Sequence, residues 1–187
     1  EISACLVGSE MCIRDRDNIQ PTALNLNKFK AIYEDSFPIE ERRGWENLKS
    51  LLYGGHEFFK AYAIFHDSQF VGFITSWVFP EAVYIEHFAT DAALRGSGIG
   101  SAALSQLIDS TSLPIVLEVE PAESGETAQR RIGFYRRLGF HDLPDYKYIQ
   151  PPYSPDLPSI PMTLMVHGTL DPDVARKRIY KHVYEAE

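Results

Sequence analysis

The sequence has little cysteine, no long apolar run and no excess of basic residues, and each absence excludes a class of protein. Both cysteines, Cys5 and Cys12, lie near the start of the 187 residues, so the remainder can form neither disulfides nor thiolate zinc sites. No apolar stretch approaches the roughly 20 residues of a membrane span. The net charge of −8 argues against a nucleic-acid partner, which requires a basic face. We expect a soluble, cytoplasmic protein, monomeric or homodimeric, that binds neither membrane nor nucleic acid.

The histidines do not indicate a metal site. They are scattered along the chain, with no i,i+4 pair and no neighbouring cysteine, at His56, His66, His141, His167 and His182. His87 is separate, because it lies beside a glutamate. We therefore expect no metal.

Residues 1–16 differ from the rest of the chain. They have no clear period, no basic leader and no cleavage site, so they do not form a convincing signal peptide. They resemble the translated adapter tract found at the ends of metagenome-derived reading frames. We interpret residues 1–16 as a non-native tract, with a genuine edge strand at Leu6 and Val7 as the alternative. Residues 17–187 are long enough for one domain, and 44% of the whole sequence is hydrophobic.

The most informative stretch is Arg-Gly-Ser-Gly-Ile-Gly at residues 95–100. Before it, residues 82–89 are rich in β-branched and aromatic side chains and follow Pro80, which predicts a strand. After it, apolar residues at four-residue spacing predict an amphipathic helix over 98–110. A glycine-rich turn leaves the first N–H groups of a helix unpaired and lets an anion approach them. This stretch is therefore predicted to bind phosphate.

Three kinds of phosphate-binding loop have glycines at such spacing. A P-loop requires Lys-Ser or Lys-Thr after its last glycine, whereas Ser101 and Ala102 follow Gly100. A dinucleotide fingerprint requires glycine or alanine where Ser101 stands. The remaining pattern is R-x-x-G-x-G, formed by Arg95, Gly98 and Gly100. It resembles the pyrophosphate loop of the GNAT superfamily of acetyl-CoA-dependent N-acyltransferases.

A second motif strengthens this resemblance. A predicted helix ends in Phe-Tyr-Arg-Arg-Leu-Gly-Phe at residues 134–140, similar to the Tyr-x-x-x-Gly-Phe ending of the family. Gly139 can adopt the left-handed conformation of a C-terminal cap, and the next phenylalanine can then pack on Phe134 or Tyr135. Capping explains neither the tyrosine nor the order strand, loop, helix, strand, helix. The resemblance extends over about residues 58–165.

The resemblance implies a fold and an activity. The fold class is α/β (α+β), a single GNAT-like acyltransferase domain with a mixed, mostly antiparallel sheet flanked by helices. The glycine-rich loop is expected between strand 82–89 and helix 98–110. The implied activity is direct transfer of an acetyl group from acetyl-CoA to a small-molecule or peptide amine in a ternary complex. An alternative is a non-catalytic acyl-CoA binding or sensing module, which keeps the glycine loop but whose acid and base residues catalyse no proton transfer.

The resemblance also implies site residues. Tyr135 is expected to protonate the departing thiolate, and Glu118 is similar to the glutamate that acts as base in ribosomal-protein N-acetyltransferases. Ala128 stands where many relatives have an asparagine that holds the pantetheine arm, which puts that contact in doubt. Arg130 and Arg131 could instead reach the coenzyme phosphates, with a solvated helix face as the alternative for at least one of them. The expected acetyl-CoA contacts lie at the end of the first strand, in the loop and on the second helix: Phe88, Ala89, Thr90, Arg95, Gly96, Ser97, Gly98, Ile99, Gly100 and Arg131.

Glu86 is a second candidate for the base. Strand alternation predicts that Glu86 shares a face with Tyr84 and Phe88, while His87 points the other way. A glutamate among aromatic residues lies either at a solvated rim or in a site.

Three more positions keep a structural alternative. Glu118 is expected to share a strand face with Glu120, and is either the base or a carboxylate at a sheet edge. The Glu-Glu-Arg-Arg segment at residues 40–43 is either a solvated connector with local ion pairs or part of the amine entrance. Tyr153, in a proline-rich loop, is either a substrate contact or a packing residue.

The remaining elements follow from periodicity and from turn residues. We expect helices at 26–37, 45–53 and 171–184, strands at 58–65, 70–79, 115–120, 145–149 and 162–166, and a tight hairpin at 66–69.

Overall fold

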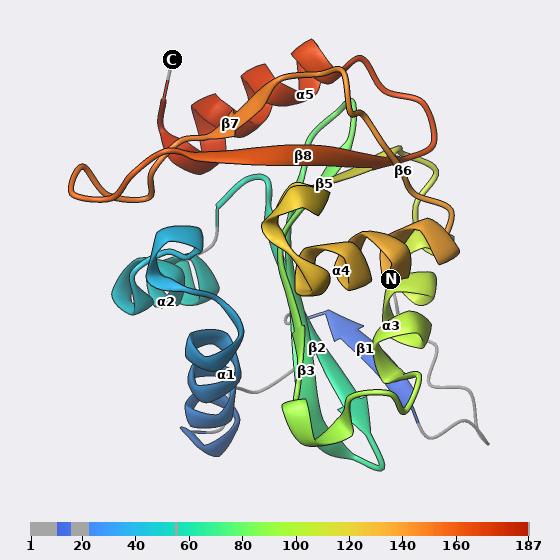
Figure 1. The fold of residues 1–187 in the computed structure, drawn as a ribbon. Helices are drawn as coiled ribbons and strands as arrows, with labels where there is room; N and C mark the ends of the chain where they lie inside the picture. Colours follow the sequence, from blue (N-terminus) through green and yellow to red (C-terminus); the bar gives the residue numbers. More distant parts are fainter. Residues whose placement is uncertain (1–10, 16–22, 55, 187) are drawn as a thin grey trace.

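In the computed structural model, which describes residues 11–15, 23–54 and 56–186, helices cover both faces of a mixed sheet (Figure 1). The strands are β1 (Met11–Asp15), β2 (Phe59–His66), β3 (Gln69–Val78), β4 (Val83–Thr90), β5 (Ile115–Val119), β6 (His141–Asp142), β7 (Tyr148–Gln150) and β8 (Ile160–His167). Their order is β1-β2-β3-β4-β5-β8-β6, with β7 paired to β8 outside this path. Among the described strands, only β4 and β5 pair in parallel, and the other pairs are antiparallel. The predicted fold class is confirmed.

The helices divide between the two faces of the sheet. They are α1 (Ala23–Ser36), α2 (Trp45–Gly54), α3 (Ile99–Asp109), α4 (Glu126–Arg137) and α5 (Pro172–Ile179), which continues as the π-helical η5 (Tyr180–Tyr184). Short 3-10 turns lie at η2 (Ile39–Glu41), η3 (Ala92–Leu94) and η4 (Ala122–Ser124). Buried side chains of α1, α2, α5 and η5 form one core, and those of α3 and α4 form a second. The sheet therefore has two separate hydrophobic layers.

The N-terminal tract is partly described. Met11–Asp15 forms edge strand β1, antiparallel to β2, with Met11 opposite His66. The alternative edge strand at Leu6 and Val7 lies outside the described residues. This pairing does not test the origin of residues 1–16, so the non-native tract stays a prediction, as does the domain that starts after it.

The hairpin between β2 and β3 has the predicted length. Asp67 and Ser68 form its turn, with φ angles of 48° and 62°. Two consecutive left-handed residues give the turn a twist that matches antiparallel strands.

A bulge in β4 changes the direction of its side chains. Thr75 of β3 pairs with His87, but the next residue, Ser76, pairs with Ile85. Glu86 is therefore the extra residue of a β-bulge, which bends the strand and breaks the alternation of its faces.

Beyond the bulge the two faces exchange. His87 packs edge-on against the rings of Tyr33 and Phe37 in α1, at centroid distances of 4.9 and 4.8 Å. Phe88 lies on the opposite face, with its ring 6.2 Å from that of Phe134 in α4. The expectation that Phe88 shares a face with the glutamate is wrong, because simple alternation takes no account of the bulge.

The two parallel strands separate after three paired positions. Residues 83–85 of β4 pair with residues 115–117 of β5, and the pairing stops there although both strands continue. Glu86 and Glu118 follow the last paired residues. The sheet therefore opens at these two carboxylates.

Candidate functional site

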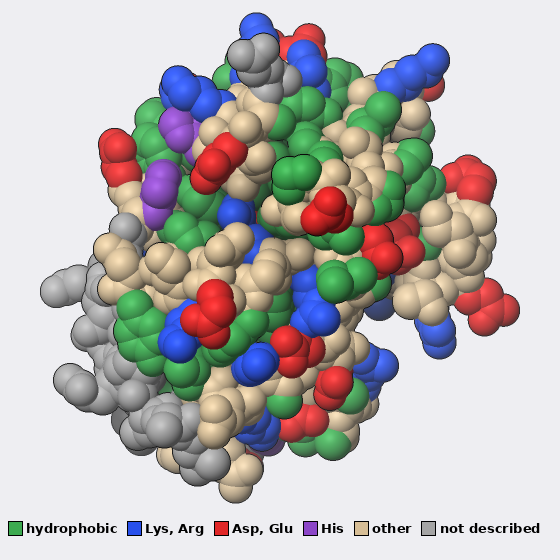
Figure 2. Space-filling view, turned by 90° about the vertical axis from the view of Figure 1, so that its left-hand side faces the viewer, with side chains coloured by type: hydrophobic (Ala, Val, Ile, Leu, Met, Phe, Trp, Pro, Cys, Tyr) green, Lys and Arg blue, Asp and Glu red, His purple; other side chains and the backbone are tan. Residues whose placement is uncertain are grey.

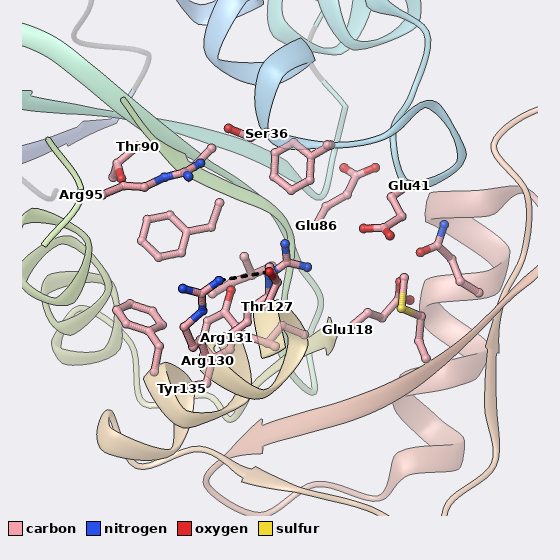
Figure 3. A pocket seen from close by; sticks show the side chains of 18 of the residues that line it. Ser36, Glu41, Glu86, Thr90, Arg95, Glu118, Thr127, Arg130, Arg131 and Tyr135 are labelled. Atoms are coloured by element: carbon pink, nitrogen blue, oxygen red, sulfur yellow. Dashed lines mark hydrogen bonds between the residues drawn. The ribbon is translucent and has the colours of Figure 1, made fainter. Parts of the chain in front are cut away.

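A cleft of about 560 Å³ lies where β4 and β5 separate, and a hollow of about 400 Å³ adjoins it at the glycine loop. Phe88, Ala89, Thr90, Arg95 and Phe134 line both cavities. The labelled side chains of Figure 3 come from four sides of the cleft: the end of α1 and η2, strand β4 with its following loop, strand β5, and α4. In that view they are Ser36, Glu41, Glu86, Thr90, Arg95, Glu118, Thr127, Arg130, Arg131 and Tyr135.

The structure brings the predicted site residues together, with one exception. All three candidate catalytic residues and Arg131 line the cleft, and the other candidate acetyl-CoA contacts line the adjoining hollow. The exception is Ser97, whose hydroxyl donates a hydrogen bond to the carbonyl oxygen of Leu94 at 2.6 Å and lines neither cavity. The arrangement shows that these residues are neighbours, and their roles stay predictions.

The glycine loop fits an anion. Gly96 and Gly98 have φ angles of 82° and 84°, and a Cβ on either would meet no atom within 4 Å. The conformation, rather than crowding, therefore requires glycine. The first hydrogen bond of α3 joins the N–H of Ala102 to the carbonyl of Gly98 at 3.0 Å. The N–H groups from Ile99 to Ser101 have no partner within the helix and can bind phosphate.

The end of α4 positions Tyr135. Gly139 has a φ of 87° and donates its N–H to the carbonyl of Arg136, while Phe140 donates to the carbonyl of Tyr135, each at 3.1 Å. This is a Schellman cap, and it confirms the predicted helix ending. The rings of Tyr135 and Phe140 lie 5.6 Å apart. Burial raises the pKa of Tyr135 to about 12 although Arg131 opposes the shift, so the hydroxyl is protonated at neutral pH.

Glu86 is held by three donors. Its side chain is 0% exposed, and its Oε1 lies 2.5 Å from Nε of Arg43. Trp77 donates its indole N–H to the other oxygen at 2.8 Å, and the Tyr153 hydroxyl donates to Oε1 at 3.1 Å. Burial alone would raise the pKa of Glu86, but the Arg43 charge and the hydrogen bonds lower it below its usual range. Glu86 is therefore ionised and paired.

Arg43 is buried rather than solvated. Its side chain is 12% exposed, and the guanidinium lies 5.4 Å from the ring of Trp77 and 5.1 Å from that of Tyr153. It also donates a hydrogen bond to the carbonyl of Val183 in η5. The solvated-connector interpretation of residues 40–43 is wrong for Arg43, because its partners come from β4 and the C-terminal helix.

Glu118 combines burial with hydroxyl partners. Tyr148 donates a hydrogen bond to its Oε1, and Tyr184 donates to its Oε2 at 2.8 Å. Burial raises the pKa of Glu118 to about 7. Hydrogen bonds from Tyr148, Tyr184 and Tyr84 oppose this shift, and the negative charge of Glu86 adds to it. The carboxylate can therefore gain and lose a proton near neutral pH.

Glu120 does not share the environment of Glu118. Strand β5 ends at Val119, so alternation no longer fixes the direction of the next side chain. Glu120 accepts a hydrogen bond from Nη1 of Arg131 in α4 at 3.2 Å. Arg131 lines the same cleft as Glu118, so the expectation that the two glutamates share a strand face stays a prediction.

Residues 26–140 match the family model described as the acetyltransferase (GNAT) family. This chain belongs to the GNAT family. It is 39% identical to a GNAT-family acetyltransferase from Bacteroides thetaiotaomicron, with a TM-score of 0.81 over 90% of this chain and 98% of that one. The recognition made from the two sequence motifs is confirmed.

Two solved structures share the GNAT fold at lower identity. The ribosomal-protein-S18-alanine N-acetyltransferase of Escherichia coli is 18% identical, with a TM-score of 0.59 over 86% of this chain and 96% of that one. Arabidopsis thaliana Naa50, solved with the bisubstrate analogue CoA-Ac-MVNAL, is also 18% identical, with a TM-score of 0.59 over 86% and 99%. No curated protein sequence matches the chain significantly.

Sequence reasoning missed several side chains of this GNAT site. Tyr148 and Tyr184 each donate a hydrogen bond to Glu118. Arg43 pairs with Glu86, whereas the sequence placed it only in a segment whose alternative was the amine entrance. Tyr148 and Tyr184 fall outside the family match at residues 26–140. The one available signal was the clustering of tyrosines after the second motif, which by itself named no partner.

The described part of this GNAT chain has no group of three metal-binding side chains that could hold an ion, and no helix there is long and apolar enough to cross a membrane.

Figure 2 shows acidic and basic side chains interspersed on the face that carries α1 and α2. The expected absence of a nucleic-acid partner stays a prediction, as do compartment and oligomeric state.

Proposed function

We propose that this GNAT protein is an N-acetyltransferase that moves an acetyl group from acetyl-CoA to an amine by direct attack in a ternary complex. One observation carries the proposal: Glu118, a buried carboxylate with a pKa of about 7, faces the cleft that adjoins the hollow at the glycine loop. A base with a pKa near the working pH is effective in proton transfer. The Naa50 complex, which contains the bisubstrate analogue CoA-Ac-MVNAL, supports the ternary geometry.

The donor is assigned to the open end of the cleft. The N–H groups that follow Gly98 bind the pyrophosphate, and Arg95 and Arg131 offset its charge. The thioester lies along residues 88–90, where one edge of β4 pairs with β3 and the other faces the cleft. Backbone N–H groups on that free edge stabilise the tetrahedral oxyanion.

The acceptor enters beside Glu118. An alkylammonium must lose a proton before its nitrogen can attack the thioester carbonyl, and Glu118 takes this proton directly or through a water. Glu86 is the weaker candidate, because Arg43 and two hydrogen-bond donors already stabilise its charge. When the tetrahedral intermediate collapses, the C–S bond breaks and the Tyr135 hydroxyl gives its proton to the leaving thiolate.

Thiol release from acetyl-CoA across a panel of amines tests the proposal. We expect amine-dependent release, with N-acetylated product identified by mass. Glu118→Gln should lose this activity at neutral pH, while Glu123→Gln, at an exposed position in η4, should keep it. Tight acetyl-CoA binding without thiol release for any amine would favour the non-catalytic binding module.

A further inference from the structure

We propose that the C-terminal part of the chain holds the catalytic base: Tyr148 of β7 and Tyr184 of η5 are positioning residues that fix the carboxylate of Glu118 for proton transfer. The inference rests on the proposed function, because it takes Glu118 as the base. It concerns residues outside the family match at residues 26–140.

Each oxygen of the carboxylate has its own hydroxyl donor. Tyr148 donates to Oε1 of Glu118, and Tyr184 donates to Oε2 at 2.8 Å. The Tyr84 hydroxyl lies 3.3 Å from that of Tyr184 and extends the network. Because each oxygen is held by a donor from a different element, rotation of the carboxylate would break at least one of the two hydrogen bonds. The lone pairs that remain are available to a proton from the cleft.

Tyr148 is itself held in place. It is buried, and its ring packs edge-on against that of Tyr180, at a centroid distance of 5.8 Å. The Tyr180 hydroxyl donates to the backbone carbonyl of Ile149, which ties η5 to β7. Tyr180 supports the geometry from the side and makes no hydrogen bond to Glu118 in the described structure.

Tyr184 is fixed by a ring contact and by its neighbour in η5. Its ring lies 4.8 Å from that of Tyr153. The preceding residue, Val183, accepts a hydrogen bond from Arg43, whose guanidinium is also paired with Glu86. The buried ion pair therefore anchors η5 next to the base, which gives a structural reason for an ion pair at this position.

The hydroxyls also influence protonation. Hydrogen bonds to a carboxylate favour its ionised form, so these donors oppose the effect of burial on the pKa of Glu118. The tyrosines around it have raised pKa values and stay neutral, which leaves Glu86, paired with Arg43, as the charged carboxylate that faces it. The titratable side chains that face Glu118 are Tyr84 and Glu86 from β4, Tyr148 from β7, Tyr153 from the loop, and Tyr180 and Tyr184 from η5.

A substrate-free titration of the full chain tests the inference. The ¹³C signal of the Glu118 carboxyl carbon is identified by its absence in Glu118→Gln, and its midpoint is followed by NMR. We expect a midpoint near pH 7 in the unaltered protein and in the control Tyr146→Phe, whose hydroxyl donates to Asp173 rather than to the Glu118 network. Tyr148→Phe and Tyr184→Phe should each raise it by about one pH unit, because each removes one donor to the charged form. Both variants keep the ring, and melting curves report whether the fold is kept.

The pH dependence of kcat/KM, measured with whichever panel amine is acetylated, gives the second readout. In Tyr148→Phe and Tyr184→Phe the acidic limb should move upward with the NMR midpoint, which a purely structural tyrosine would not cause. An unchanged midpoint in both folded variants overturns the positioning role, whether or not the protein acetylates amines. Absence of amine-dependent thiol release from the unaltered protein overturns the proposed function instead.

Discussion

The two sides of the cleft are built in different ways. The side to which we assign the donor consists mainly of residues 88–100, one continuous stretch along an open hollow that Phe134 and Arg137 of α4 also line. The acceptor side consists of Arg43, Glu86, Glu118, Tyr148 and Tyr184, buried side chains from five separate segments. The donor side is therefore specified by local sequence, whereas the acceptor side exists only when distant segments have packed.

This difference assigns separate tasks to the two sides. Glycines with positive φ and unpaired helical N–H groups can hold an anion mainly through the backbone, with Arg95 and Arg131 adding charge. Buried carboxylates have properties that depend on their neighbours, so Arg43 lowers the pKa of Glu86, whereas burial raises the pKa of Glu118 to about 7. Variants on the acceptor side should change rate and stability, and variants on the donor side should change affinity.

The largest effect is expected for Glu118→Gln. Removal of a general base typically lowers the rate by about 10²–10⁴. The base must be deprotonated, so kcat/KM of the unaltered protein should rise as pH increases through about 7, and the variant should lose this acidic limb. Stopped assays of thiol release from pH 5 to 9 measure both. If Glu86→Gln lost the limb and Glu118→Gln kept it, the assignment of the base would be reversed.

Arg43→Met should destabilise the acceptor side. Removing one partner of a buried ion pair leaves the other charge uncompensated and costs about 3–5 kcal/mol. The matched control is Arg42→Met, whose more exposed pair with Glu34 is 3.5 Å long and should contribute no more than about 1 kcal/mol. Urea unfolding compares the two variants. Equal losses would mean that the buried pair does not hold the acceptor side.

Tyr135→Phe keeps the ring that packs on Phe140 and removes only the hydroxyl. If Tyr135 is the acid, kcat should fall by roughly one to three orders of magnitude, with melting temperature and acetyl-CoA affinity nearly unchanged. The loss should shrink for an acyl donor whose thiol leaves more easily. Equal kcat values under conditions where chemistry limits turnover would return Tyr135 to a packing role.

Gly98→Val should weaken acetyl-CoA binding by about tenfold or more, because a side chain would occupy the space in front of the loop. A tenfold loss of affinity corresponds to about 1.4 kcal/mol of binding free energy. A positive φ of 84° also makes the substitution cost about 1–2 kcal/mol in stability. Gly125→Val is the control, since Gly125 has a φ of 124°, has no atom within 4 Å of its Cβ position and lines neither cavity. Calorimetry separates the two, and equal affinities in both variants would reject the loop as the pyrophosphate site.

The donor side could be predicted from the sequence because its physics is local. Glycine spacing fixes the loop that precedes α3, and Gly139 fixes the cap that follows Tyr135. The fold class was implied by the family resemblance that these two motifs carry. Ser97 shows the limit of the motif, since a residue within the loop can turn its side chain to the backbone instead of the cleft.

The acceptor side could not be predicted in the same way. The bulge at Glu86 depends on how β3 and β4 pair, and it exchanged the faces of His87 and Phe88. Arg43 finds its carboxylate 43 positions away, and its carbonyl partner lies 140 positions away. A local sequence pattern cannot predict contacts between residues so far apart in the sequence. The raised pKa of Glu118 likewise arises from burial that appears only in the folded chain.

The acetyl-CoA affinity of Glu118→Gln, measured by calorimetry beside its turnover, tests the separation of the two sides most directly. The account predicts that this variant binds acetyl-CoA as tightly as the unaltered protein, although its turnover falls by about 10²–10⁴. A loss of acetyl-CoA affinity in Glu118→Gln as large as that in Gly98→Val would contradict it, because Glu118 would then act in donor binding rather than in proton removal.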